Sequence, residues 1–149
     1  MTPVHHERAL DSLRTLIWAT ERQLHDAAAT EGVAITDISA LSYLRALGDM
    51  SQTALAERVS LSSSAATSMV DRLERRGLVV RAADPVDRRK SLVRLTPLGD
   101  EAALRIRRRF AVAFDQFAED DLTTAATVLA QLADGLLLAQ TTARMRIRD

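Results

Sequence analysis

The chain has no cysteine among its 149 residues, and it has only 5 glycines, 3 prolines and 3% aromatic residues. The absence of cysteine excludes a disulfide framework, a thiolate metal site and thiol redox chemistry, and we expect a cytoplasmic protein. Few turn-forming residues beside 47% hydrophobic residues favour a mainly α-helical fold over a β-sandwich. The length suits one domain.

Long hydrophobic runs are also missing. The N-terminus, MTPVHHERALDSLR, has no uninterrupted apolar segment, and the densest apolar stretch, GLLLA at 135–139, is much shorter than a membrane span. From these two features we expect neither export nor a membrane-spanning segment.

Enzyme motifs are absent as well. The sequence contains no G-x-S-x-G elbow, no phosphate-binding loop and no H-E-x-x-H. Its three histidines are the adjacent pair His5 and His6 and the distant His25, a set that cannot assemble a metal site or a catalytic triad. We therefore expect no catalytic residues, no metal and no cofactor.

Charge is unevenly distributed along the chain although the net charge is zero. The segment from Arg72 to Arg109 carries 12 cations and 5 acids, whereas the remainder carries 8 cations and 15 acids. Such a basic segment can bind the phosphates of a nucleic acid. The alternative is a solvated surface whose cations pair with nearby acids.

The first fifty residues predict a helical core. Apolar residues at helical spacing predict one helix from about Glu7 to Thr30 and a second from an N-cap at Thr36 to Gly48. No internal repeat or flexible linker interrupts the chain.

Residues 51–77 predict a helix-turn-helix. Ser51 can cap a short helix, Ser60 and Leu61 suit a tight turn, and Ser62 can cap a longer helix that ends at Gly77. The longer helix places one apolar stripe toward the core, formed by Ala66, Met69, Val70 and Leu73.

The opposite face of that longer helix carries short hydroxyl side chains. They allow a close approach to another surface and still offer hydrogen-bond donors and acceptors, as a recognition helix requires. The candidate DNA contacts on this helix are Ser62, Ser63, Ser64, Thr67 and Ser68, followed by Arg72 and Arg75. The alternative is an ordinary helical hairpin whose serines are only solvated.

A β-hairpin follows directly. The strands LVVR and SLVRLT flank the loop AADPVDRRK, so that Arg88, Arg89 and Lys90 lie at the hairpin tip. A hairpin attached to a helix in the major groove would lie over the DNA backbone, where cations meet phosphates or enter the minor groove. We expect Asp87 to pair with an arginine there and to orient its guanidinium.

The segments RLERRGLVVR and D-x-R-x-x-x-x-x-L-T, with Asp87, Arg89, Leu95 and Thr96 in the second, resemble the MarR family of bacterial transcription regulators. The resemblance extends over nearly the whole chain. It implies a mainly α winged-helix fold with six helices and a two-stranded β-wing, and it implies DNA binding. It further implies that the helix from Ser62 enters the major groove and that Arg89, held by Asp87, reaches the minor groove.

One departure from the family pattern concerns base recognition. Ala65 and Ala66 stand where many members carry threonine and valine, and the first turn of the helix has no cation. We therefore expect Ser64, Thr67, Ser68 and the shape of the DNA to carry more of the recognition.

Thr96 and Pro97 are an N-cap and first-position pair that begins the next predicted helix, over residues 97–118. Four arginines are distributed around it: Arg105, Arg107, Arg108 and Arg109. They either contact DNA phosphates or pair with acids such as Asp11, Glu21 and Asp26.

The last predicted helix, from about Asp121, has an apolar stripe too wide for one subunit to bury, so a second copy is expected. The stripe consists of Ala125, Val128, Leu129, Leu132, Leu136, Ala139 and Ala143. The family resemblance implies a two-fold dimer formed by residues 1–33 and 119–149, with residues 36–96 reading DNA and residues 97–118 connecting them. Such a dimer places recognition helices about 34 to 36 Å apart on a palindromic operator.

The leading hypothesis is a dimeric repressor that a small molecule, aromatic or phenolic, releases from DNA by lodging between the dimerisation helices and the wings. Trp18, His25 and Tyr43 are candidate pocket residues, although a packed aromatic ring or a satisfied histidine would look the same. The alternative function is a winged-helix module that binds another protein and has no specific DNA binding.

Overall fold

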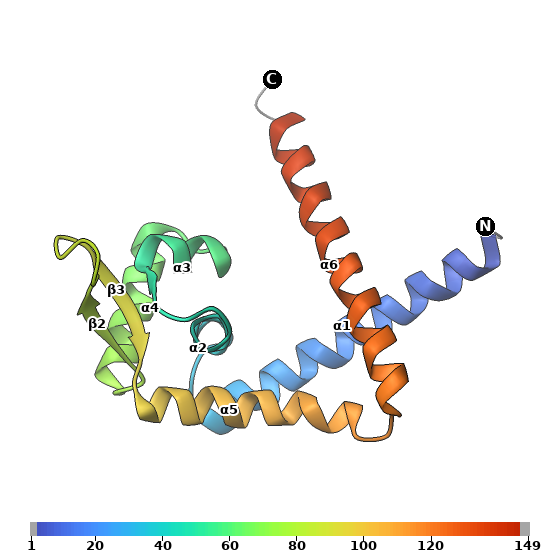
Figure 1. The fold of residues 1–149 in the computed structure, drawn as a ribbon, viewed down its shortest axis with the longest axis horizontal. Helices are drawn as coiled ribbons and strands as arrows, with labels where there is room; N and C mark the ends of the chain where they lie inside the picture. Colours follow the sequence, from blue (N-terminus) through green and yellow to red (C-terminus); the bar gives the residue numbers. More distant parts are fainter. Residues whose placement is uncertain (1–2, 147–149) are drawn as a thin grey trace. The chain divides into compact units, whose positions relative to one another are not determined.

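The computed structural model describes residues 3–146, with side chains described for residues 4–139. This part of the chain contains six α-helices, one 3-10 turn and a three-stranded sheet (Figure 1). In chain order the elements are α1 (Pro3–Glu31), α2 (Ile35–Leu47), β1 (Met50–Ser51), α3 (Gln52–Arg58), α4 (Ser63–Arg75), β2 (Val79–Ala83), β3 (Ser91–Leu95), α5 (Pro97–Ala111), η1 (Val112–Phe114) and α6 (Glu119–Arg146).

The predicted fold class is confirmed, and the sheet has one strand more than expected. Its order is β1-β3-β2, with both pairs antiparallel. β2 and β3 form the predicted wing, in a register that places Val79 opposite Leu95 and Arg81 opposite Val93. The two-residue β1 adds Met50 opposite Val93, a pairing too short to leave a period-two pattern in the sequence.

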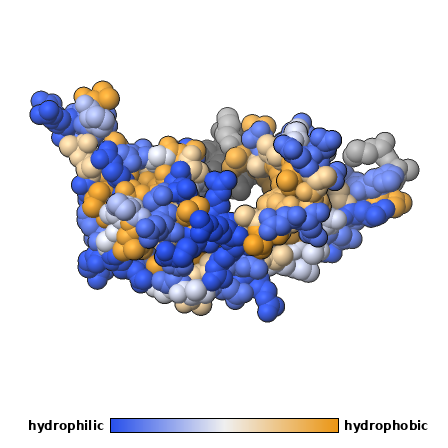
Figure 2. Space-filling view, turned by 60° about the horizontal axis from the view of Figure 1, so that its bottom comes forward, coloured by the Kyte–Doolittle hydropathy of each residue, from blue (hydrophilic) through white to orange (hydrophobic). Residues whose placement is uncertain are grey.

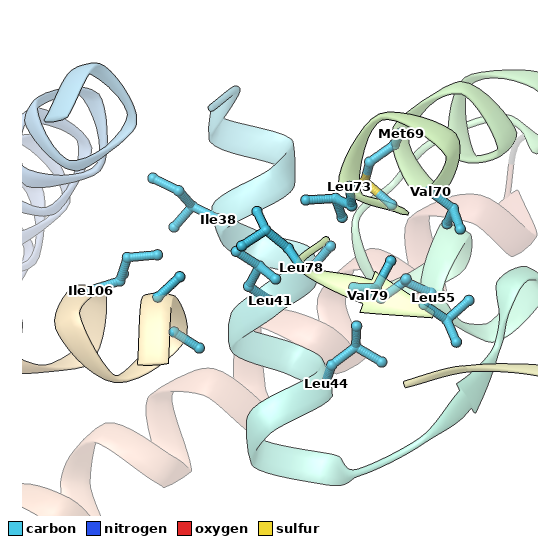
Figure 3. Packing of buried hydrophobic residues seen from close by; sticks show 14 of the residues in the cluster. Ile38, Leu41, Leu44, Leu55, Met69, Val70, Leu73, Leu78, Val79 and Ile106 are labelled. Atoms are coloured by element: carbon cyan, nitrogen blue, oxygen red, sulfur yellow. The ribbon is translucent and has the colours of Figure 1, made fainter. Parts of the chain in front are cut away.

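The chain divides after Phe110 into two compact units. The first contains one apolar cluster, to which α1, α2, α3, α4, the sheet and α5 contribute (Figure 3). The four α4 residues predicted to face inward are all buried, because spacings of three and four residues align them on one side of the helix. The ten largest fully buried side chains are Ile38, Leu41, Leu55, Met69, Leu73, Ile106, Val70, Val79, Val93 and Asp37.

The ends of the helices follow local capping chemistry. The Ser51 hydroxyl accepts a hydrogen bond from the Ala54 amide at 3.1 Å, and the Ser62 hydroxyl accepts one from Ala65 at 3.3 Å. Gly77 has φ of +70°, the left-handed conformation predicted for the end of α4.

The predicted N-cap of the second helix is wrong. α2 begins at Ile35, one residue before Thr36, and Ala34 occupies the N-cap position. The Asp37 carboxylate supplies the stabilising contact by accepting the Ala34 amide at 3.1 Å. A carboxylate in the first helical turn is a stronger acceptor than a threonine hydroxyl and also interacts favourably with the helix dipole.

A close backbone approach joins the wing to α5. The Thr96 hydroxyl donates to the Gly77 carbonyl at 2.6 Å and accepts the Gly99 amide at 3.0 Å, so the predicted cap at Thr96 is confirmed. A Cβ at Gly99 would lie 1.9 Å from the Leu78 carbonyl oxygen. Only glycine therefore fits here, and the exit of β3 is held against the start of β2.

The helix expected over residues 97–118 ends at Ala111, where the chain tightens into the 3-10 turn η1. The last helix begins at Glu119, two residues before the predicted start at Asp121. Three successive acids, Glu119, Asp120 and Asp121, occupy its first turn, where the helix dipole favours negative charge.

No described residue of α6 is buried. Val128, Leu129, Leu132 and Leu136 are 48%, 40%, 44% and 54% exposed. Ala143, at the end of the predicted stripe, lies outside the residues whose side chains are described.

In the described part of the chain, Glu119–Ala139 also has the length and mean hydropathy (1.5) of a membrane-crossing helix, in contrast to the expectation that no such stretch exists. Length and hydropathy alone do not distinguish a membrane span from a helix that packs on another protein.

Candidate nucleic-acid interface

The face of α4 that carries the hydroxyl residues is open to solvent. Ser62, Ser63, Ser64, Thr67 and Ser68 are all exposed, because the opposite side of the same helix provides the buried stripe. Several of these hydroxyls already have partners. The Thr67 and Ser68 hydroxyls donate to the carbonyls of Ser63 and Ser64, at 3.0 and 3.2 Å, and the Ser62 and Ser64 hydroxyls lie 3.2 Å apart.

The wing tip presents its three cations outward. Arg88, Arg89 and Lys90 are exposed, and the tip is the mostly hydrophilic projection at the left of Figure 2. The loop is closed by the Asp84 amide, which donates to the Lys90 carbonyl at 3.0 Å. The Asp84 carboxylate also accepts the Val86 amide at 2.8 Å, so the loop has a defined shape although its side chains are exposed.

Asp87 acts on the main chain of the loop. Its carboxylate accepts the Arg89 amide at 3.1 Å and lies 3.8 Å from the Lys90 ammonium. We expected Asp87 to orient a guanidinium; instead it fixes the backbone from which Arg89 projects. Among the described residues the Arg89 guanidinium has no hydrogen-bonding partner, so its donors are available to a phosphate or a base edge.

Arg72 and Arg75 have different surroundings on α4. Arg72 donates two hydrogen bonds to the fully buried Asp37, at 3.0 Å from Nε and 2.5 Å from the terminal nitrogen. This hydrogen bonding raises the pKa of Arg72 above its ordinary value. Arg75 is exposed, and among the described residues its side chain donates only to the Asp71 carbonyl, at 3.3 Å. Arg72 thus ties α4 to α2, whereas the Arg75 guanidinium retains donors for DNA.

Arg81, on β2, organises the site, although its position inside an ordinary strand pattern gave no signal in the sequence. Its terminal nitrogens contact the Asp71 carboxylate at 2.6 Å, the Glu74 carboxylate and the Gln52 side-chain oxygen at 3.3 Å. Its amide donates to the Glu74 carboxylate at 3.1 Å. The hydrogen bond to Asp71, assisted by Glu74, raises the pKa of Arg81. One side chain therefore joins the wing to both helices of the helix-turn-helix.

The corner between α1 and α2 is also held by arginines. Arg76 donates to the carbonyls of Gly32 and Glu31 at 2.5 and 2.9 Å. Arg105 forms two hydrogen bonds with the Glu31 carboxylate, at 3.1 and 2.8 Å. The hydrogen bond from Arg105 lowers the pKa of Glu31, and that from Glu31 raises the pKa of Arg105.

The sequence left two roles open for Arg105, contact with DNA phosphates or pairing with an acid of the protein. The structure favours the second role for this arginine. Its partner is Glu31 rather than Asp11, Glu21 or Asp26. Arg107 lines a cavity, and DNA contacts of Arg108 and Arg109 stay a prediction.

The three candidate pocket residues do not line that cavity. Trp18 is 62% exposed beneath the Arg14 guanidinium, His25 is exposed, and Tyr43 is half-buried with the Arg58 guanidinium 5.9 Å from its ring centre. The cavity has a volume of about 430 Å³ and lies between α2 and α5. It is lined by Ser42, Arg45, Ala46, Ala103, Ile106, Arg107 and Phe110.

A recognition helix with an exposed hydroxyl face, joined to a cationic wing, defines a winged-helix DNA-binding protein. Comparison with known proteins agrees. Residues 33–91 match the model of the MarR family. The chain is 30% identical over 126 residues to the HTH-type transcriptional repressor MdtR of Bacillus subtilis (strain 168), an alignment that covers 82% of this chain and 81% of that protein.

Solved structures share the fold. A MarR family protein from Bacillus stearothermophilus superimposes with a TM-score of 0.72 at 22% identity, over 92% of this chain and 99% of that one. A mutant of S. aureus MepR, bound to an oligodeoxyribonucleotide, superimposes with a TM-score of 0.60 at 17% identity. The superposition covers 86% of this chain and 97% of that one. The chain belongs to the MarR family, and it is a DNA-binding transcriptional regulator rather than an enzyme.

Proposed function

We propose that this protein is a dimeric repressor in the cytoplasm that binds a palindromic operator and is released by a small aromatic or phenolic anion. The observation that carries the proposal is the reading head itself. By reading head we mean α4 together with the wing, which Arg81 joins through Asp71 and Glu74. Because each chain provides one such head, a symmetric pair would read two inverted half-sites.

In this proposal the exposed hydroxyl residues of α4 lie in the major groove. Arg75 contacts phosphates, and Arg88, Arg89 and Lys90 of the wing contact the backbone or the minor groove. Asp87 contributes indirectly by fixing the main chain at Arg89. Arg72 is better regarded as a residue that positions α4, because the buried Asp37 occupies its guanidinium.

Dimerisation is supported by the apolar surface of α6. Four side chains at helical spacing, Val128, Leu129, Leu132 and Leu136, are each at least 40% exposed, which is unfavourable in water. A second copy can cover them by packing its own α6 against this stripe. The stripe would equally suit a lipid bilayer by hydropathy, and sedimentation of the purified protein without detergent distinguishes the two.

In this proposal the ligand that releases the protein from its operator binds in the cavity between α2 and α5. Its lining includes the apolar residues Ala103, Ile106 and Phe110, and its volume of about 430 Å³ suits a small ligand. Arg45 and Arg107 supply positive charge. Arg45 Nε is buried without a hydrogen-bond partner among the described atoms, and the same guanidinium pairs with Asp100 in the first turn of α5. An anion that competes with Asp100 for Arg45 would shift the start of α5, which directly follows the wing.

Selection of random DNA duplexes with the purified protein tests the main proposal. We expect an inverted repeat bound by two chains, with affinity well above that for a scrambled duplex at moderate salt. Equal affinity for both duplexes would refute specific regulation.

Titration of the protein–operator complex with salicylate, benzoate and uncharged benzamide tests release. The two anions should dissociate the complex more effectively than benzamide, because only they can compete with Asp100 for Arg45. The anions should be less effective on the Arg45→Met protein.

A further inference from the structure

The side chains around Thr67 form a chain of hydrogen bonds with a determined direction. Arg81 approaches the Gln52 side-chain oxygen at 3.3 Å, the Gln52 side-chain nitrogen approaches the Thr67 hydroxyl at 2.8 Å, and the Thr67 hydroxyl approaches the Ser63 carbonyl at 3.0 Å. The four residues come from β2, α3 and α4, so the chain depends on the assembled reading head.

Donor and acceptor chemistry leaves one assignment. A guanidinium only donates, so the oxygen of the Gln52 amide faces Arg81 and its NH2 group faces Thr67. The Thr67 hydroxyl must then accept from Gln52. Its single proton is used in the hydrogen bond to the Ser63 carbonyl, which is only an acceptor.

Thr67 is therefore an exposed threonine whose hydroxyl has no proton to donate to DNA. It cannot donate to guanine O6 or N7, or to thymine O4, without breaking a bond within the protein. Its hydroxyl keeps one lone pair, which can only accept, from adenine N6 or cytosine N4. The other group of Thr67 open to DNA is its methyl group, and the natural partner of a methyl group in the major groove is the 5-methyl group of thymine.

We infer that Thr67 is a specificity-determining residue that recognises a thymine through its methyl group, and that Gln52 and Arg81 are positioning residues that hold its hydroxyl away from the DNA. This inference rests on the proposed function, because it requires α4 to lie in the major groove. Ser63 provides a contrast on the same face, because among the described residues its hydroxyl has no partner and retains its proton for a base edge.

Two substitutions separate the methyl group from the hydroxyl. Thr67→Ser keeps the hydroxyl and removes the methyl group, whereas Thr67→Val keeps a methyl group and removes the hydroxyl. The DNA partner changes in the same way, because replacing one thymidine of the selected operator by deoxyuridine removes only the 5-methyl group. Affinities of the native protein and both variants are measured on each duplex.

At one thymidine position the native protein should lose about fourfold in affinity per half-site on deoxyuridine substitution, the factor typical of one buried methyl group. Thr67→Val should retain this discrimination. Thr67→Ser should bind the thymidine duplex about fourfold more weakly per half-site and lose the discrimination, with no further loss on the deoxyuridine duplex.

Gln52→Met tests the positioning role, because it removes the donor to Thr67 while keeping similar side-chain volume. Discrimination between thymidine and deoxyuridine should decrease, while the midpoint of thermal unfolding stays within a few degrees of the native value. Thr30→Ser is the matched control. Thr30 is an exposed helical threonine with the same bond to the carbonyl four residues earlier, at 2.8 Å, and its variant should behave as the native protein.

The results separate this inference from the proposed function. If the native protein does not prefer its selected duplex over a scrambled one, both are refuted. If it does prefer that duplex but no thymidine position is sensitive, or Thr67→Val loses as much affinity as Thr67→Ser, only the methyl recognition is refuted.

Discussion

The first compact unit and α6 differ in how completely a single chain buries its apolar residues. Leu41, Leu55 and Leu73 in the first unit are fully buried, whereas Leu132 and Leu136 of α6 are 44% and 54% exposed. Both regions use leucine at helical spacing, so residue type does not explain the difference. The reading head is stabilised by its own core, while α6 leaves an apolar surface exposed, which the proposed dimer would cover.

The arginines show a parallel difference. Arg72, Arg81 and Arg105 each form an ion pair with an acid on a different secondary-structure element, whereas the Arg89 guanidinium has no such partner among the described residues. The pairs of Arg72 and Arg81 hold the reading head in position, the pair of Arg105 joins α5 to α1, and the Arg89 guanidinium is available to DNA. Substitutions test both differences. We expect the largest effect from a substitution in α6 and the smallest from the loss of the ion pair between Arg105 and Glu31.

Leu132→Glu should disrupt the proposed dimer and thereby weaken DNA binding. A charge in the centre of the apolar stripe cannot be buried against a second copy, so we expect monomers and a loss of operator affinity of about 100-fold or more. Sedimentation equilibrium and gel-shift titration measure the two effects. Thr127→Glu is the control, because Thr127 lies on the other side of α6 and the same charge there should leave the dimer intact. A dimeric Leu132→Glu protein would rule out this surface as the interface.

Arg72→Met should destabilise the first unit by about 2 kcal/mol, because it leaves the buried Asp37 carboxylate without its cation. Arg72 itself is 39% exposed, so solvent reduces the effect below that of a wholly buried pair. Urea unfolding followed by circular dichroism measures it. Arg94→Met removes the exposed ion pair to Asp49, at 2.6 Å, and should have a smaller effect. Equal losses in the two variants would contradict the structural role of Arg72.

Arg89→Ala should weaken operator binding by about tenfold without changing the free energy of unfolding, since its guanidinium forms no contact within the described protein. Affinity measured between low and moderate salt should show a shallower dependence, by about one unit of slope for each arginine lost. A winged-helix module that binds only proteins would show no salt-dependent binding to duplex in either form.

The Arg105 and Glu31 pair should make a small contribution to stability that depends on pH. Because the folded pKa of Glu31 lies below its ordinary value of 4.5, the stabilisation is fully present above that value and is lost as pH falls through the folded pKa. At pH 6 the loss of free energy of unfolding in Arg105→Met should be well below that in Arg72→Met, because solvent screens the exposed guanidinium. The loss should shrink further as the pH is lowered through the folded pKa of Glu31, and a loss that is constant with pH would exclude the pair as its source.

The sequence predicted elements well where the signal is local. The caps at Ser51, Ser62 and Thr96 and the turn at Gly77 depend on residues within a few positions of one another, and all four are confirmed. The α2 cap failed because the helix begins one residue earlier than predicted, with the Asp37 carboxylate in its first turn accepting the Ala34 amide. The two-residue strand β1 was not predicted, because it is defined only by its pairing with β3.

Within the candidate site, too, features with a local sequence pattern were predicted and features that depend on packing were not. The exposed face of α4 and the cationic wing tip could be found from spacing, and their contact with DNA stays a prediction. Neither Gln52 nor Arg81 could be found, because their positions are ordinary for a helix and a strand. The effector candidates Trp18, His25 and Tyr43 were chosen by residue type, while the cavity depends on how α2 packs on α5.

By itself the sequence determined the helix-turn-helix, the wing and the apolar stripe of α6, because helical and strand periods and capping act over short distances along the chain. Only the tertiary structure decided which cations stay free. Arg72 meets Asp37 across 35 positions and Arg105 meets Glu31 across 74. Pairings at such separations depend on how the helices pack, since nearly any acid could satisfy an arginine until the fold brings one within hydrogen-bonding distance.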